Sequence, residues 1–169
     1  MSALSTLKAT VLPISNLLTG IVALFSLAML VPAVLAAVYD DSGQVAFGST
    51  AVAILAPSAL CWAFTRRYRR ELKARDGILL VTLSWVLVPA LAALPLMWGI
   101  PGLSFTDAYF ESVSGLTTTG STVLSGLDHL AASLNFWRHF LHWIGGMGII
   151  LLAVAILPLA ADRDSGLVV

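Results

Sequence analysis

The chain has 169 residues, of which 59% are hydrophobic and 11% are charged, and its mean hydropathy is +0.94. A water-soluble domain carries about 25% charged residues, so this composition argues strongly against a soluble enzyme, and the dominance of apolar residues excludes a disordered chain. The net charge is zero, so bulk charge gives no reason to expect nucleic acid as a partner.

Four stretches contain no Asp, Glu, Lys or Arg: residues 9–39, 42–65, 77–106 and 139–161. Each is longer than the roughly 20 residues that a helix needs to cross the hydrocarbon core of a bilayer. Because lipid offers no hydrogen-bond partners, such segments must be helical. We therefore predict an all-α integral membrane protein with four transmembrane helices, of which two lie within residues 1–66, one covers 77–99 and one covers 135–160.

The first two predicted helices form a close pair. Pro32 lies inside the first and is expected to kink it. Only about six residues, including Asp40 and Asp41, connect the first helix to the second. A connection this short cannot hold a further pore-forming segment.

A basic cluster follows the second helix. Six of the nine Lys and Arg residues lie between residues 66 and 75. The positive-inside rule places this loop, residues 67–76, in the cytoplasm, and with it the N-terminus. Binding of lipid headgroups or of a partner is the alternative role for the cluster.

The segment after Pro101 differs from the rest of the chain. Ser104 and Asp107 predict the start of a helix, over residues 105–117, that is too short to span a membrane. Six of the seven residues in 117–123 are Thr, Ser or Gly, which disfavours helix. A short helix followed by non-helical chain at membrane depth predicts a re-entrant loop, which is tolerated where it is buried in protein or lines a water-filled cavity.

The Thr/Gly segment has the composition of an ion filter. Backbone carbonyls can replace the water around a cation if the chain is extended and turned so that they face one axis. Residues 118–122 meet this requirement, with Gly120 able to adopt a positive φ. The alternative is a hydroxyl-rich turn that binds no ion.

Two motifs carry a family resemblance. The run from Asp107 to Val123, together with Trp137-Arg138 and the Trp-Ile-Gly-Gly-Met-Gly-Ile sequence of residues 143–149, resembles the Trk/Ktr/HKT potassium-transporter superfamily and its bacterial Trk branch. The resemblance implies a pore built from four M1–pore-loop–M2 repeats in one chain, preceded by two extra helices. Residues 77–161 would then be the first repeat, and residues 162–169 a cytoplasmic tail or a linker.

The resemblance also implies a function and a set of ligands. The function is translocation of K⁺, which is the transported ion and not a cofactor, without covalent chemistry and without a covalent cofactor. The filter carbonyls would belong to Thr118, Thr119, Gly120 and Ser121, with Thr117 and Thr122 flanking them. Glycine at position 120 implies a preference for potassium, since members with serine there tend toward sodium.

Further implications concern location and partners. The resemblance implies the bacterial inner membrane, contact with membrane lipid, a homodimer of full-length subunits and a cytosolic nucleotide-binding regulatory subunit. The chain departs from the family because it contains one repeat, which supplies one quarter of the pore. The remaining repeats must come either from a longer subunit, which we expect, or from other copies of the chain.

Two other classes of function stay open at this stage. One is a membrane assembly subunit that conducts no ions. The other is a haem- or metal-binding redox protein that uses His139 and His142, which share a helix face. Similarly, Asp107 and Glu111 can serve either as buried supports behind the filter or as attractors of cations, and Arg138 can pair with either acid.

Overall fold

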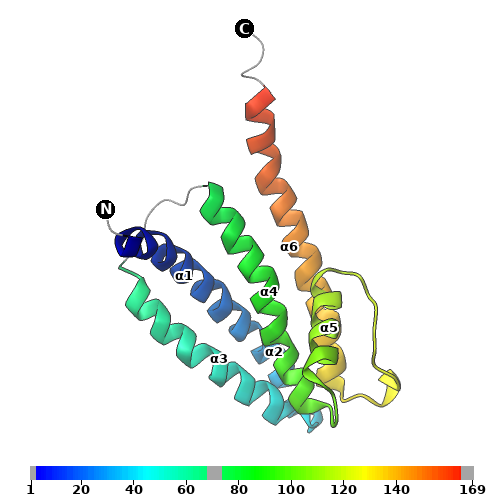
Figure 1. Ribbon diagram of the computed structural model, residues 1–169. Helices are drawn as coiled ribbons and strands as arrows, with labels where there is room; N and C mark the ends of the chain where they lie inside the picture. The colour runs from blue at the N-terminus through cyan, green and yellow to red at the C-terminus, as the bar shows by residue number, and fades with distance from the viewer. Residues whose placement is uncertain (1–2, 68–73, 165–169) are drawn as a thin grey trace.

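A computed structural model describes the backbone of residues 3–67 and 74–164, and the side chains of residues 11–67, 75–148 and 150. Over these ranges the chain forms α-helices and one short 3₁₀ turn, and no strand, which confirms the all-α prediction. The helices, drawn in Figure 1, are α1 (Ala3–Ala28), α2 (Leu30–Tyr39), α3 (Gly43–Thr65), α4 (Ala74–Gly99), α5 (Phe105–Leu116) and α6 (Ala132–Asp164).

The first predicted helix is interrupted where proline requires it. Pro32 cannot donate to the carbonyl of Ala28, and its ring crowds that carbonyl. The helix is interrupted at Met29, the residue after Ala28. The amide of Met29 donates to the carbonyl of Ser26 at 3.2 Å, and its carbonyl accepts from the amide of Ala33 at 3.2 Å. The boundary between α1 and α2 thus lies next to the position where Pro32 is expected to disturb the helix.

Three helical segments within the described residues are long and apolar enough to cross a membrane: Val11–Tyr39, Gly43–Thr65 and Arg75–Gly99. The fourth predicted span, residues 135–160, lies within α6. The side chains of residue 149 and of residues 151–160 lie outside the described part of the chain. The backbone there is helical and extends beyond the other helices in Figure 1.

Helix boundaries differ from the sequence-based ones where charged residues begin. Helix α4 starts at Ala74, three residues before the predicted start at residue 77, with Asp76 in its first turn. Helix α6 extends to Asp164, into the predicted tail. The physical reason is that a charge ends the apolar run but not the helix, and an acidic residue in a first turn is favourable.

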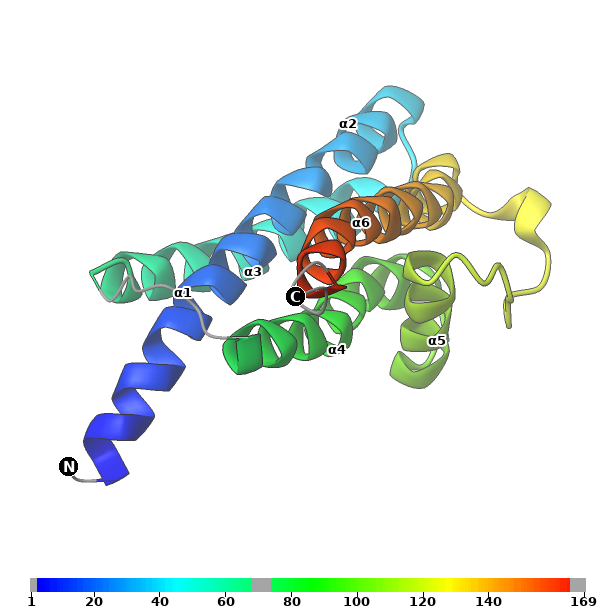
Figure 2. The same cartoon turned by 90° about the horizontal axis from the view of Figure 1, so that it is seen from above.

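The loop that follows the short helix α5 brings the chain back to the side from which α5 starts. In Figure 1, α5 begins at the lower end of the molecule, rises part of the way along α4, and its following loop descends to the lower end, where α6 begins. Seen from above in Figure 2, α5 lies on one side of α4 and α6, and the helices α1–α3 lie on the other. This is the geometry of a re-entrant loop.

Trp137 is at the centre of the core that holds these parts together. The side chain is fully buried. Its ring centroid lies 5.6 Å from that of Phe25 in α1 and 5.7 Å from that of Phe47 in α3. Its Nε1–H donates to the carbonyl of Ala92 in α4 at 3.1 Å. One side chain of α6 thus contacts three other helices.

Candidate ion filter at the end of the short helix

The start of α5 is fixed by its own sequence. The Ser104 hydroxyl accepts from the amide of Asp107 at 3.1 Å and donates to the Asp107 carboxylate at 2.7 Å. This confirms the predicted cap at Ser104, and it engages Asp107 in capping.

The end of α5 is closed by the first residues of the Thr/Gly segment. The amide of Thr119 donates to the carbonyl of Ser114 at 2.9 Å, and the amide of Thr118 donates to the carbonyl of Gly115 at 2.9 Å. These two bonds define a Schellman motif, which requires a left-handed residue at the position of Thr118. Thr118 has φ 57°, an unusual value for a β-branched residue.

The Schellman motif also sets the direction of the following carbonyls. The amides of Thr118 and Thr119 point back at α5, and the amide of Gly120 lies 3.5 Å from the carbonyl oxygen of Ser114. In a trans peptide the carbonyl of one residue points opposite to the amide of the next. The carbonyls of Thr117, Thr118 and Thr119 therefore point away from α5. Gly120 itself has φ 77°, the positive value predicted from its identity.

Ser121 is oriented differently from its neighbours. Its carbonyl accepts a hydrogen bond of 2.7 Å from the hydroxyl of Ser114 in α5. One of the two lone pairs of this oxygen is therefore used inside the chain. The bond ties the middle of the segment to the helix behind it.

The far end of the segment is held by an ion pair. Glu111 in α5 accepts from the hydroxyl of Thr122 at 2.6 Å and from the amide of Val123 at 2.7 Å through Oε1. Its other oxygen accepts from Arg138 Nε of α6 at 2.9 Å. Arg138 also donates to the hydroxyl of Thr122, at 3.2 Å. The Glu111–Arg138 pair thus lies behind residues 122–123 and holds them in place.

Close packing brings α6 against the end of α5. A Cβ atom at Gly145 would contact the backbone of Leu116, and one at Gly115 would lie 3.0 Å from Cβ of Leu141. Position 145 has no room for a larger residue, and position 115 is tightly packed. Helix α6 therefore packs closely, at Gly145, against Leu116 at the end of α5, directly before the Thr/Gly segment.

A hollow of about 560 Å³ adjoins the segment, and several polar side chains are part of its lining, which includes Gly120, Thr122, Arg138, His139 and His142. Both histidines bond a backbone carbonyl one turn earlier through Nδ1, at 2.8 Å. A carbonyl only accepts, so each Nδ1 carries the proton. No group of three potential metal ligands occurs among the described residues.

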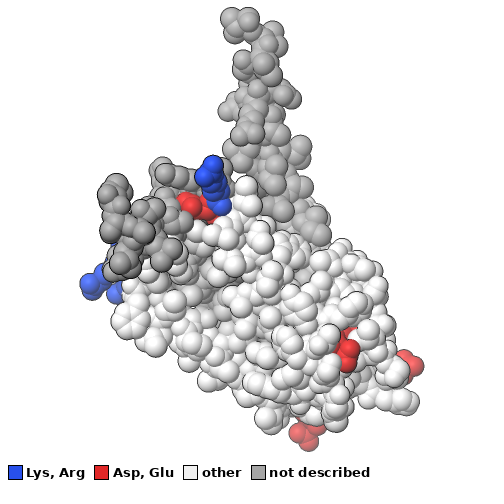
Figure 3. Space-filling view, viewed as in Figure 1, with Lys and Arg blue, Asp and Glu red and all other residues white. Residues whose placement is uncertain are grey.

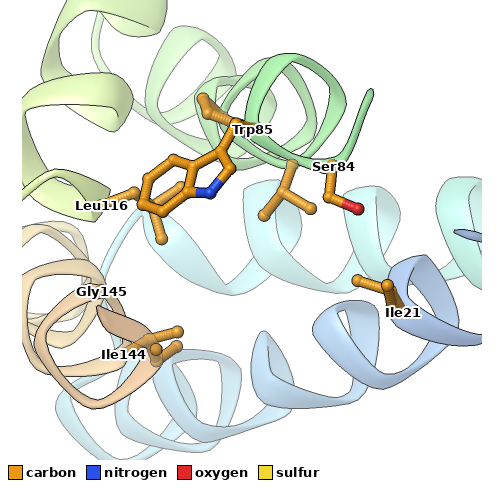
Figure 4. Close-up of a pocket in the computed structure, with 9 residues that line it drawn as sticks. Ile21, Ser84, Trp85, Leu116, Ile144 and Gly145 are labelled. Carbon is orange, nitrogen blue, oxygen red and sulfur yellow. The ribbon is translucent and has the colours of Figure 1, made fainter. Parts of the chain in front are cut away.

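An apolar cavity of about 240 Å³ lies beside Leu116, the last residue of α5. As Figure 4 shows, Ile21 of α1, Trp85 and Ser84 of α4, Leu116 of α5 and Ile144 of α6 surround it. Its lining is almost entirely apolar, with the Ser84 hydroxyl as a polar group that donates to the carbonyl of Leu80 at 2.8 Å.

Comparison with known proteins identifies the family. A family model described as "TrkH: Cation transport protein" matches residues 42–166. The chain belongs to this family. The family consists of transport proteins and not enzymes, which confirms the prediction of a non-enzyme. With three apolar helices long enough to span, membership implies a multi-pass protein of the bacterial inner membrane.

Curated relatives and a solved structure agree with this assignment. The chain is 51% identical over 139 residues to the Trk system potassium uptake protein TrkH of Vibrio parahaemolyticus, covering 82% of this chain and 29% of that protein. It is 46% identical over 147 residues to TrkH of Escherichia coli K12, covering 86% and 30%.

The crystal structure of the potassium transporter TrkH from Vibrio parahaemolyticus matches with a TM-score of 0.78 and 48% identity, covering 89% of this chain and 32% of that one. The chain thus spans about a third of the length of these relatives. The comparisons favour transport over an assembly subunit or a redox protein.

Some of the supporting contacts have no signal in the sequence. Glu111 and Arg138 are both conspicuous charged residues, but the tertiary structure decides that they pair. Asp41 and Ser133 lie 92 residues apart and are hydrogen-bonded. No local pattern marks a contact over that distance.

Proposed function

We propose that this chain supplies one quarter of a potassium-conducting pore. The observation that carries the proposal is the end of α5, where the amides of Thr118, Thr119 and Gly120 face the helix and the carbonyls of the preceding residues, 117–119, therefore point to the opposite side. A row of outward carbonyls on a well-supported segment is what replacement of the K⁺ hydration shell requires. The relatives are named as potassium uptake proteins, which supports potassium as the ion.

The proposed ligands are the carbonyls of Thr118, Thr119, Gly120 and Ser121. Among these ligands the hydrogen bonds support Thr118 most directly, through the 2.9 Å bond of the Thr119 amide, and they support Thr119 through the longer 3.5 Å contact of the Gly120 amide. Ser121 contributes only with the lone pair that the Ser114 hydroxyl does not use. Thr117 and Thr122 flank the ligands, and Thr122 anchors the segment to Glu111.

The proposed organisation follows the helices. Residues 1–66 form the leading pair, 77–161 form one M1–pore-loop–M2 repeat, and 162–169 form a tail or linker. We place the connection at residues 67–76, and the N-terminus, in the cytoplasm. Figure 3 supports this, because the Lys and Arg atoms in view gather at one end of the molecule while most of the Asp and Glu atoms lie at the other.

The proposed assembly completes the pore. Residues 117–123 are exposed. An ion bound by their carbonyls would need further oxygen ligands from other repeats. These come from the rest of a longer subunit or from other copies of the chain, and the length of the relatives supports the first source. A homodimer of full-length subunits and a cytosolic nucleotide-binding regulatory subunit belong to the same proposal.

The test is uptake of Rb⁺ and Na⁺ by potassium-uptake-deficient cells that express the native reading frame, with Gly120→Ser as the variant. A left-handed non-glycine residue costs about 1–2 kcal/mol, and relief of this strain at position 120 would displace the neighbouring carbonyls. We therefore expect the Rb⁺/Na⁺ uptake ratio to fall by about tenfold, since about 1.4 kcal/mol corresponds to a factor of ten. Gly102→Ser is the matched control, because Gly102 has φ 78° in an open turn outside the filter.

The two variants separate a filter from a general folding defect. An unchanged uptake ratio in Gly120→Ser, at normal abundance, would contradict the proposal. Equal losses in Gly120→Ser and Gly102→Ser would show that backbone strain alone explains the effect.

A further inference from the structure

Asp41, in the turn between α2 and α3, joins the leading helices to the pore repeat. Its Oδ1 accepts from the amide of Gly43 at 2.8 Å and from the hydroxyl of Ser133 at 2.7 Å. Its Oδ2 accepts from the amide of Ser133 at 2.9 Å. Gly43 is the first residue of α3, and Ser133 is the second residue of α6. One carboxylate therefore caps two helix N-termini, where the amides are otherwise unpaired and negative charge is favourable.

The surroundings make this junction tight. Ser133 is fully buried, and a Cβ atom at Gly43 would contact its hydroxyl oxygen. Position 43 thus needs glycine for the two helix ends to approach. One turn further along α6, Trp137 packs against Phe25 and Phe47 of the leading helices. The start of α6 is held at two successive levels by α1–α3.

The residue after Trp137 is Arg138, which reaches the filter. Arg138 bonds Glu111, and Glu111 bonds Thr122 and Val123. A rotation or shift of the first turns of α6 would move Arg138 and change how Glu111 holds the end of the segment. A packed helix transmits such a shift because the protein interior around it is densely packed.

We propose that Asp41 is a positioning residue for the filter, acting through the N-terminus of α6 and the Glu111–Arg138 pair. The inference rests on the proposed function, and it assigns the leading helices a role in ion selection. Asp41 contacts no ion in this proposal. It fixes the rotation and height of the helix that carries Arg138.

The test compares Asp41→Asn with Asp40→Asn in the native reading frame. Both remove one negative charge from the same turn. Asp40 is exposed and has φ 51°, a conformation that asparagine tolerates. The measured quantities are the KM for Rb⁺ uptake and the Rb⁺/Na⁺ ratio, both at equal protein abundance in the membrane.

We expect Asp41→Asn to raise the KM for Rb⁺ and lower the Rb⁺/Na⁺ ratio by about threefold to tenfold, within the range seen for mutations along a packed network. Asp40→Asn should match the wild type. Ser133→Ala retains the amide bond to Asp41 and should show a smaller change in the same direction. It also keeps the test decisive if Asp41→Asn fails to fold.

The outcomes distinguish this inference from the proposed function. If Gly120→Ser alters the ratio but Asp41→Asn and Ser133→Ala change only abundance or thermal stability, the positioning role is wrong and the filter stands. If the wild type takes up no Rb⁺, both are overturned.

Discussion

Gly145 in α6 offers the sharpest test of the packing behind the filter. A Cβ atom there would lie against the carbonyl oxygen of Leu116, 2.6 Å from its carbonyl carbon and 2.9 Å from its Cα. Non-bonded carbons normally lie about 3.5–4.0 Å apart, so Gly145→Ala must displace the end of α5 by about 1 Å. Because the contacted atoms belong to the backbone, no change of rotamer relieves the clash.

The expected cost is about 1–3 kcal/mol of stability, the usual range for overpacking. Gly148→Ala is the matched control, since a Cβ atom there meets nothing within 4 Å. Both variants gain up to about 1 kcal/mol of helix propensity from alanine, so the difference between them isolates the clash with Leu116.

The assay is thermal unfolding of the purified protein in detergent, together with Rb⁺ uptake in cells. We expect Gly145→Ala to unfold at a lower temperature than Gly148→Ala and to lose uptake, because Leu116 leads directly into the proposed filter. Equal unfolding temperatures and equal uptake would refute the packing of α5 against Gly145.

Two further predictions concern the charged groups. Removing one partner of a buried ion pair costs up to about 3–5 kcal/mol, and the side chains of Arg138 and Glu111 are 10% and 2% exposed. We therefore expect Arg138→Gln to destabilise the protein more than the double variant Glu111→Gln/Arg138→Gln, and an unfolding measurement that ranks them in the reverse order would contradict this. Burial acts to raise the pKa of Asp41, but hydrogen bonds from Ser133 and Gly43 outweigh it and hold the pKa below its ordinary value of 3.8. A lowered pKa in the folded state stabilises the protein at pH values above the ordinary pKa, and this stabilisation is lost as the pH falls through the folded-state pKa. The stability advantage of the wild type over Asp41→Asn should therefore shrink below about pH 4. An advantage that does not depend on pH would contradict this prediction.

Much of the fold could be predicted because its determinants are local. The apolar runs are long enough to identify spans without knowledge of their neighbours. Pro32 interrupts its own helix. Ser104 caps α5 by accepting a hydrogen bond from the amide of Asp107, three residues later. Gly120 has a positive φ, as its lack of a side chain allows.

Part of the candidate site could not be predicted for the opposite reason. No propensity places Thr118 in a left-handed conformation; the Schellman bonds to Ser114 and Gly115 do so. The carbonyl of Ser121 turns toward α5 because the Ser114 hydroxyl is within reach once the segment folds back. These orientations depend on where α5 ends relative to the returning chain.

The sequence by itself determined that this is a helical membrane protein with a Thr/Gly re-entrant segment, since burial in lipid and short-range hydrogen bonds act on consecutive residues. Only the tertiary structure decided that Arg138 pairs with Glu111 rather than Asp107, across 27 residues, and that Asp41 bonds Ser133 across 92. Contacts over such separations are selected by the packing of whole helices. The contacts that support the proposed filter therefore depend on how the helices pack together.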